Sequence, residues 1–241
     1  FKHWISTEDH LSRFIGLSTE PSKSDWHNYL VENGYTPDTT LLLDHPHLPE
    51  EVIRDAPKDW DVFSSDFRSE LPAEHQMAHF LGRKAADFIR DHKDDPFCLY
   101  VSTFEPHSPY NGPYNDLYDP ASLPVGPAFL KKPDNAPLIS RLRAENNMQF
   151  LEGSSESYMG YVENQIAEFN DLSSEYGWRQ LRARYLANIT LVDDMVGMIV
   201  KSLEEQGLLE ETVIVFTSEH GEMAGDHGML EKRSMYDESA R

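Results

Sequence analysis

The sequence has little positive charge. Its 241 residues include 21 lysines and arginines against 42 aspartates and glutamates, which gives a net charge of −21. Such a surface repels phosphate backbones, and this argues against a nucleic-acid partner. It does not exclude an anionic small substrate, because a local cation or a bound metal can override the overall field.

Cysteine and long apolar runs are also scarce. Cys98 is the only cysteine, so an intrachain disulfide is impossible, which is compatible with the cytoplasm and with the periplasm. No run approaches the roughly 20 apolar residues that a membrane-spanning helix needs, and no signal peptide opens the chain. We therefore expect no membrane span, and the compartment is left open.

The chain nevertheless contains enough apolar material for a substantial core. Apolar residues make up 39% of it, with 12 Phe, 11 Tyr and 4 Trp, a composition unlike that of disordered proteins. No methionine precedes Phe1, and nothing marks Arg241 as a natural end. We therefore expect a segment of a larger protein.

The pattern of apolar residues predicts three helices. Residues 26–35 form a short helix that is stopped by Gly34. Residues 74–92 form the second helix, and residues 178–206 form a long one that ends at Gly207. An apolar residue recurs every three or four positions along the long helix, as in a buried stripe. This stripe consists of Tyr185, Ile189, Val192, Val196, Ile199 and Leu203.

Two short apolar runs, residues 97–102 and 212–217, are typical of strands that are covered on both faces. A Pro-rich loop follows the first, and residues 137–176 are polar and partly helical. Strands that alternate with a long helix predict an α/β domain with a mostly parallel sheet flanked by helices. Active sites of such sheets lie just beyond the carboxyl ends of the strands, and polar, His-containing loops follow both runs.

The loop after the first run is Glu105-Pro106-His107-Ser108-Pro109-Tyr110. Its two prolines restrict the backbone around His107, which suits an imidazole that must be held in one orientation. Such an imidazole can bind an anionic group or hand a proton to a leaving oxygen. On spacing alone, a Pro-rich surface loop with an incidental histidine explains the segment equally well.

The loop after the second run begins Ser218-Glu219-His220-Gly221-Glu222. A carboxylate and an imidazole side by side at a strand end can coordinate one divalent cation, and Gly221 allows a sharp turn behind them. Taken by itself, a solvated acidic turn explains the pair as well.

Lys232 follows Glu219 by 13 residues, after Gly225-Asp226-His227-Gly228. That spacing lets its ammonium group return to the same site and hold an anion. Most lysines are solvated, however, so the alternative for Lys232 alone is a surface lysine.

Together these segments resemble the sulfatase family of the alkaline-phosphatase-like superfamily, over residues 59–241. The shared motifs are Pro96-Phe97 with Val101-Ser102, Pro106-His107-x-Pro-Tyr110, Tyr185-x-Ala187-x-Ile189-Thr190-x-Val192-Asp193-Asp194, and Phe216-Thr217-Ser218-Glu219-His220-Gly221-Glu222 followed by Gly225-Asp226-His227-Gly228, Lys232 and Tyr236. The resemblance implies that residues 1–241 are part of a single catalytic domain, without its N-terminal nucleophile segment and C-terminal subdomain.

The resemblance also implies roles for individual residues. His107 matches the histidine that contacts the sulfate ester near its leaving oxygen, and Lys232 matches the lysine that binds the sulfate. Glu219 and His220 match a pair that ligates a divalent cation, usually Ca²⁺. His227 is a further candidate for substrate binding, although its Gly-flanked turn could equally need it for local hydrogen bonds.

The sequence departs from the family pattern in two ways. The metal-binding pair usually begins with Asp, and the extra methylene of Glu219 moves the carboxylate by about 1.5 Å, whereas Ca²⁺ needs oxygen ligands at roughly 2.3–2.6 Å. The family nucleophile is a formylglycine made from Cys or Ser in a Cys/Ser-x-Pro/Ala-x-Arg motif, and no such motif occurs here. Ser22 lacks the pattern, and Cys98 reads as a small core residue. We therefore expect formylglycine upstream, and no turnover by these residues alone.

Other candidates are weaker. His45-Pro46-His47 resembles a metal-binding tract, but an exposed loop is the better interpretation because no third ligand is near. Asp193 and Asp194 lie next to apolar positions of the long helix and read as hydrogen-bonding groups of a helix surface or domain interface.

The expected activity of the parent protein is hydrolysis of small-molecule or glycan sulfate monoesters. Two alternatives remain open at this point. One is a phosphonate monoester or phosphodiester hydrolase of the same superfamily. The other is a catalytically dead binding module, which the Glu219 departure and the absent nucleophile favour weakly.

Overall fold

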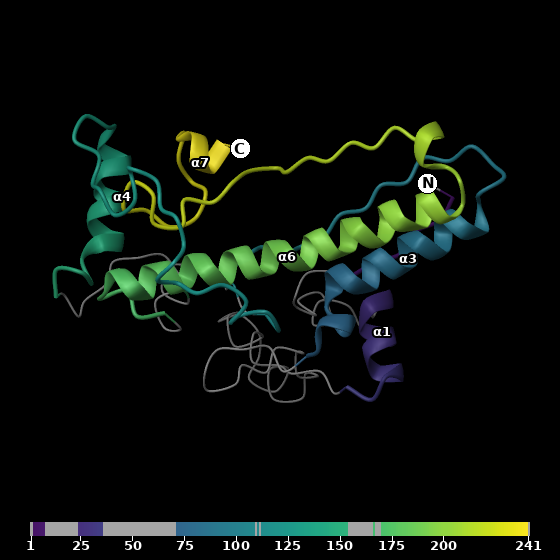
Figure 1. Cartoon of the computed structure of the whole chain (residues 1–241). Coiled ribbons are helices and arrows are strands. Elements are labelled where there is room, and N and C mark those ends of the chain that lie inside the picture. The colour runs from purple at the N-terminus through teal and green to yellow at the C-terminus, as the bar shows by residue number, and fades with distance from the viewer. Residues whose placement is uncertain are drawn as a thin grey trace, which may run out of the picture. The chain divides into compact units, whose positions relative to one another are not determined.

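The chain divides into two compact units. Unit 1 comprises Phe1–Glu105 and Leu191–Glu210, and unit 2 comprises Pro106–Thr190 and Glu211–Arg241. The long helix α6, Glu175–Glu205, contributes its first half to unit 2 and its second half to unit 1 (Figure 1). The computed structural model describes residues 2–7, 24–35, 71–108, 110, 112–153, 166 and 170–240.

Unit 1 is built from helices. The short helices are α1 (Asp25–Glu32) and the 3-10 turn η2 (Ala73–His75). The longer α3 (Met77–Asp91) presents a buried face of mainly apolar side chains, and the second half of α6 packs against it. A second 3-10 turn, η3 (Leu209–Glu211), follows α6.

The two long helices of unit 1 approach closely at Gly82 on α3. A methyl group at this position would lie 2.8 Å from Met198 Sδ and 3.3 Å from the Cα of Met195 on α6. Farther along, the Ser202 hydroxyl donates to the carbonyl oxygen of Ala86 at 3.2 Å. Asp194 Oδ2 lies 3.1 Å from Nε2 of the buried His79. Asp194 is thus a hydrogen-bonding group of the α3–α6 contact, as the sequence predicted.

Unit 2 contains α4 (Leu138–Met148), the first half of α6, the short α7 (Asp237–Ala240) and long connecting loops. The core lies against α6, where the buried indole of Trp178 donates to the carbonyl oxygen of Leu172 at 3.0 Å. Its buried members are Tyr110, Phe129, Ile166, Leu172, Trp178, Leu181, Ala224 and Leu230.

The predicted helices are confirmed, with small shifts at their ends. Helix α1 ends just before Gly34, which has a φ of +86°, and α6 ends before Gly207, which has a φ of +70°. The buried stripe predicted for α6 is partly wrong. Ile189 is 38% exposed, whereas Ala187, Leu191 and Met195 are buried. Because apolar residues surround this helix on several sides, their spacing alone does not identify the buried side.

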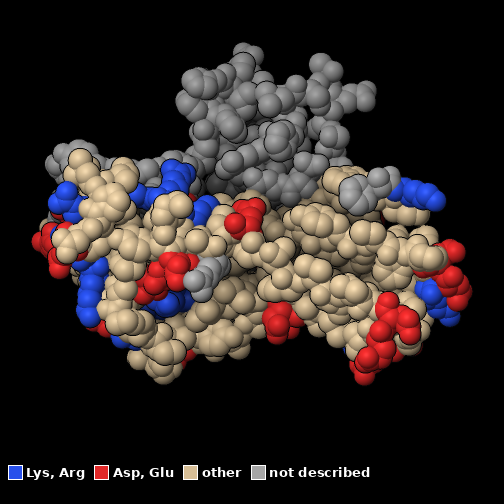
Figure 2. Space-filling view, turned by 90° about the horizontal axis from the view of Figure 1, so that it is seen from above, with Lys and Arg blue, Asp and Glu red and all other residues tan. Residues whose placement is uncertain are grey.

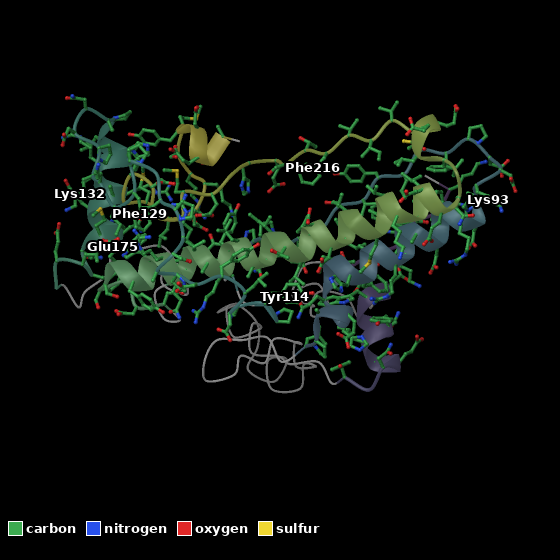
Figure 3. All side chains as sticks on the ribbon, in the orientation of Figure 1. Lys93, Tyr114, Phe129, Lys132, Glu175 and Phe216 are labelled. Carbon is green, nitrogen blue, oxygen red and sulfur yellow. The ribbon has the colours of Figure 1, made fainter. Side chains whose placement is uncertain are left out.

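The two predicted strands are not confirmed. Within the described residues the only bridge is an isolated one between Phe129 and Asp226, and Figure 1 draws residues 97–102 and 212–217 as extended coil. Phe216, which is labelled in Figure 3, is 74% exposed. A strand needs a neighbouring strand for its N–H and C=O groups, and neither run has one among the residues described. Cys98, predicted to be a core residue, is exposed for the same reason.

None of the described helices combines the length and the apolar character that a bilayer-spanning helix requires. On the face shown in Figure 2, acidic and basic side chains are interspersed among neutral ones, so the net charge of −21 does not form a single acidic patch there.

Candidate functional site

His107 and Lys232, two of the candidate residues from the sequence, contact each other in unit 2. Lys232 Nζ lies 3.0 Å from His107 Nε2, and both residues are half-buried. His107 Nδ1 lies 2.7 Å from the carbonyl oxygen of Ser108. A carbonyl only accepts, so Nδ1 carries the proton and Nε2 accepts from the ammonium group of Lys232. The imidazole is therefore neutral in this arrangement, with a fixed tautomer.

Glu219 and His220 form the second pair. Glu219 Oε1 lies 3.0 Å from His220 Nε2, and His220 Nδ1 lies 2.7 Å from the carbonyl oxygen of Gly221. Nδ1 meets that carbonyl while Nε2 faces the carboxylate of Glu219, so the two side chains are paired with each other. Metal-binding histidines commonly make such a bond to a backbone carbonyl. The Glu219 side chain is 84% exposed and that of His220 is 32% exposed.

These two residues fit part of a cation site. A carboxylate oxygen and an imidazole nitrogen converge on one point, which suits a divalent ion. Among the described residues, however, no group of three or more His, Cys, Asp or Glu side chains is arranged to hold a metal. Glu219 and His220 would supply only two ligands to such an ion.

Backbone contacts hold the segments of the two pairs together. The N–H of Gly221, next to His220, donates to the carbonyl oxygen of Ser239 at 2.8 Å. The hydroxyl of Ser239 in turn donates to the carbonyl oxygen of Lys232. The N–H of Met223 donates to the carbonyl oxygen of Glu231, directly before Lys232, at 3.0 Å. The chain thus turns after His220 and comes back, so that the segment of Lys232 lies beside the segment of His220.

The turn depends on left-handed backbone conformations. Gly225 has a φ of +96°, and a methyl group on it would lie 2.6 Å from the ring of Phe129. Gly228 has a φ of +67°, and a methyl group there would lie 2.1 Å from Met148 Sδ. Glycine alone adopts these conformations freely and leaves this space empty. The two glycines of the Gly-x-x-Gly pattern therefore make the return of the chain toward Lys232 possible.

Helix α4 supports the segment that carries Lys232. Asn147 Oδ1 accepts from the N–H of Leu230 at 3.2 Å. The guanidinium group of Arg143 donates to the carbonyl oxygen of Arg233 at 2.5 Å. Both contacts come from one helix and flank Lys232 on either side in the sequence, so α4 fixes the backbone from which the lysine projects.

His227 contacts the C-terminal segment and the loop that carries Ala128. Its ring stacks on Tyr236 with centroids 3.9 Å apart, and Nε2 lies 3.7 Å from Glu238 Oε2. Its N–H donates to the carbonyl oxygen of Ala128 at 2.9 Å, and its φ is +54°. None of the contacts described for His227 reaches His107 or Lys232. Whether His227 also binds substrate stays a prediction.

Three titratable side chains near these pairs, Tyr110, Tyr185 and Glu222, were not predicted from the sequence. Tyr110 is 1% exposed, and burial, followed by the charge of Glu222, raises the pKa of its phenol well above the ordinary value. Burial likewise raises the pKa of Glu222. Burial and the charge of Glu222 raise the pKa of Tyr185 to about 12. The only signal in the sequence was that Tyr110 and Glu222 each lie within a motif.

A family model described as Sulfatase matches residues 14–241. The chain belongs to the sulfatase family. A multifunctional alkaline phosphatase superfamily protein, PehA of Trinickia caryophylli, is 27% identical over 229 residues, which are 92% of this chain and 40% of PehA. Arylsulfatase K of Gallus gallus is 33% identical over 147 residues, which are 60% of this chain and 26% of that protein.

The fold is also similar to that of a solved hydrolase. Phosphonate monoester hydrolase of Agrobacterium radiobacter superposes with a TM-score of 0.60 at 24% identity, over 89% of this chain and 39% of that one. This sulfatase-family chain therefore has the fold of alkaline-phosphatase-like hydrolases over most of its length. It spans less than half the length of the relatives that it matches.

Proposed function

We propose that the protein hydrolyses sulfate monoesters, and that this chain supplies part of its sulfate and metal site. The observation that supports this most directly is the 3.0 Å contact between His107 Nε2 and Lys232 Nζ. It brings a positive charge and a titratable imidazole together in a protein with a net charge of −21. Membership of the sulfatase family supports the same activity.

In the proposed mechanism, Lys232 binds the sulfuryl oxygens through its ammonium group. The charge that develops on these oxygens in the transition state is stabilised by a fixed cation more strongly than by mobile water. His107 lies directly beside that cation, where we expect its imidazole to serve the leaving oxygen. The contact with the carbonyl oxygen of Ser108 keeps its ring in one orientation.

The tautomer of His107 limits how a proton reaches the leaving oxygen. Nε2 holds a lone pair in this arrangement, so it has no proton to give until Lys232 supplies one or turns toward the substrate. The two residues therefore act as one acid, with the transferable proton stored on Lys232 and its direction set by His107.

Glu219 and His220 would hold a divalent cation, with Ca²⁺ as the family's usual ion. A bound cation supplies Lewis-acid stabilisation of the sulfuryl oxygens. The chain's own contribution is to place Glu219 Oε1 and His220 Nε2 3.0 Å apart and to fix the imidazole by its bond to Gly221. The sequence contains no motif for a formylglycine nucleophile, so these residues act on the sulfate and the leaving oxygen only.

A specific observation favours a second candidate, hydrolysis of phosphonate monoesters. The solved neighbours are phosphonate monoester hydrolases, and PehA is described as multifunctional. Sulfate and phosphonate monoesters both present anionic oxygens around a tetrahedral centre, so Lys232 and His107 could serve either reaction.

Turnover of two model substrates by the full-length protein separates these candidates. We expect kcat/KM for 4-nitrophenyl sulfate to exceed kcat/KM for 4-nitrophenyl phenylphosphonate. The same preparation with Lys232→Ala is the control for a contaminating hydrolase, because its rate should drop with both esters. Dominant turnover of the phosphonate ester would overturn the sulfatase proposal in favour of the second candidate.

A further inference from the structure

Helix α4 holds the backbone on both sides of Lys232. Arg143 Nη1 donates to the carbonyl oxygen of Arg233 at 2.5 Å, and Nη2 reaches the carbonyl oxygen of Leu230 at 3.5 Å. Asn147, one turn farther along α4, accepts from the N–H of Leu230 at 3.2 Å. The partners in these bonds are 83 to 90 positions apart in the sequence. The lysine thus lies between two backbone positions that a distant helix holds.

The other bonds described for this segment are more local. The carbonyl oxygen of Lys232 accepts from the N–H of Ser234 at 2.8 Å and from the hydroxyl of Ser239. The carbonyl oxygen of Glu231 accepts from the N–H of Met223 at 3.0 Å, across the turn that leads to the lysine. These bonds shape the turn and the C-terminal segment, but they do not connect either to a long helix. The bonds from α4 do so.

Apolar contacts attach α4 to the turn without the help of Arg143. Ala144, the next residue of the helix, belongs to a buried cluster with Met223 and Met229 of the turn. Burial of these side chains stabilises the contact between helix and turn. Loss of the Arg143 guanidinium group should therefore leave the helix in place and release only the carbonyl oxygens beside Lys232.

Resting on the proposed function, we propose that Arg143 is a positioning residue for Lys232. Its guanidinium group holds the backbone beside the lysine, so that Lys232 Nζ stays 3.0 Å from His107 Nε2. Support from the backbone matters here because the lysine side chain is long and flexible, and a shift of about 1 Å in a reacting group can lower the rate by roughly 100-fold. The rigid fork of an arginine suits this role, since its N–H groups can donate to two carbonyl oxygens at once.

The alternative role of Arg143 is a long-range effect of its charge. A positive charge near the site attracts an anionic ester, and its removal weakens binding, which raises KM. A positioning residue acts on the transition state, so its removal lowers kcat and leaves KM nearly unchanged. Separate values of kcat and KM therefore distinguish the two roles.

Arg141 provides a matched control on the same helix. Its side chain is exposed, and the bond described for it runs from its backbone N–H to the carbonyl oxygen of Pro137 at 3.2 Å. Arg141→Ala removes the same charge as Arg143→Ala and changes the helix propensity of α4 by the same amount. It leaves the bonds to Leu230 and Arg233 in place.

The test is a double-mutant cycle in the full-length protein with 4-nitrophenyl sulfate. We expect Arg143→Ala to lower kcat by about 10-fold, with KM within about twofold of wild type. In a Lys232→Ala background the same substitution should change kcat by less than about twofold, because Arg143 acts through that residue. The melting temperature of Arg143→Ala should stay within about 4 °C of wild type, since the apolar contacts of α4 remain.

Two further variants complete the test. Arg143→Lys keeps the charge but replaces the fork by a single ammonium group, so its kcat should remain at least about threefold below wild type. Arg141→Ala should match wild type in both kcat and KM. If Arg143→Ala does not fold, Arg143→Lys replaces it in the cycle with Lys232→Ala.

The opposite results overturn the inference. A rise in KM with unchanged kcat, or a wild-type kcat in Arg143→Lys, indicates that only the charge matters. An equal loss with and without Lys232, or a loss in Arg141→Ala as large as that in Arg143→Ala, indicates a general effect on the fold.

Failure of the proposed function is a separate outcome. A wild-type protein that prefers 4-nitrophenyl phenylphosphonate removes the sulfatase proposal, and the same cycle with that ester still tests Arg143. A wild-type protein that hydrolyses neither ester removes both the function and the positioning role. An active wild-type protein with an equally active Arg143→Ala variant removes the positioning role alone.

Discussion

The contact between Lys232 and His107 joins residues that are 125 positions apart in the sequence. Both residues could be predicted, because each lies in a short motif with its own spacing. The protonation of the His107 imidazole could not be predicted, because it depends on the partner of Nδ1. That partner is the carbonyl oxygen of Ser108.

Tyr185 gives a prediction at the scale of the single residue. Burial and the nearby Glu222 raise the pKa of its phenol to about 12, compared with an ordinary value of about 10. A raised pKa means that the folded protein favours the neutral phenol. The stabilising contribution is therefore complete below about pH 10 and is lost as the pH rises toward 12.

The measurement is the tyrosinate absorbance of the protein in an alkaline titration, with circular dichroism to follow unfolding. Tyr185→Phe should reduce the amplitude of a late step of the titration near pH 12, while replacement of the exposed Tyr100 by Phe should leave that step in place. The pKa of Tyr110 is raised as well, so the test compares amplitudes: a late step of unchanged amplitude in Tyr185→Phe would show that this phenol does not contribute to it.

At the scale of the elements, the predicted helices are confirmed, whereas the predicted sheet is not confirmed among the described residues. Helices α3 and α6 satisfy their backbone hydrogen bonds internally, so the apolar pattern of 74–92 and of 178–206 was sufficient to find them. Residues 212–217 have an equally clear apolar pattern, but a strand is completed only by another segment. No such segment is paired with it among the described residues.

The packing of α3 against α6 gives a second prediction. Gly82→Ala places a methyl group 2.8 Å from Met198 Sδ and 3.3 Å from the Cα of Met195. The methionine sulfur can move, but the backbone of α6 cannot do so freely. We expect the free energy of unfolding to decrease by about 1–3 kcal/mol.

Gly197 on α6 is the matched control, because a methyl group there meets nothing within 4 Å. Gly197→Ala should raise the free energy of unfolding by about 0.5–1 kcal/mol, since alanine favours the helix. Chemical denaturation of both variants measures the two effects. A Gly82→Ala variant as stable as Gly197→Ala would contradict the close approach of the helices.

At the scale of the whole molecule, the chain has the sulfatase-family match over residues 14–241 but spans about 40% of PehA. The His45–His47 tract, interpreted from sequence as an exposed loop, lies outside the described residues. The prediction that residues 1–241 are part of one catalytic domain stays a prediction. Each of the two compact units contributes a core of its own.

The incomplete ligand set leads to a prediction about metal binding. Since Glu219 and His220 are too few for a Ca²⁺ site, we expect the 241-residue chain to bind Ca²⁺ weakly or not at all. The full-length protein should show a Ca²⁺-dependent rise in its melting temperature. In that protein Glu219→Asp should change the rise, whereas Glu211→Asp, at an exposed position, should not. Tight stoichiometric binding of Ca²⁺ by the 241 residues alone would contradict this prediction.

The most direct measurement is a double-mutant cycle on His107 and Lys232, with kcat/KM of the full-length protein for 4-nitrophenyl sulfate. His107→Ala and Lys232→Ala should each lower kcat/KM by about 100-fold. The double variant should be no more than about threefold below either single one, because the 3.0 Å contact makes the two residues one acid. Losses that multiply in the double variant, or single variants with wild-type activity, would contradict the account.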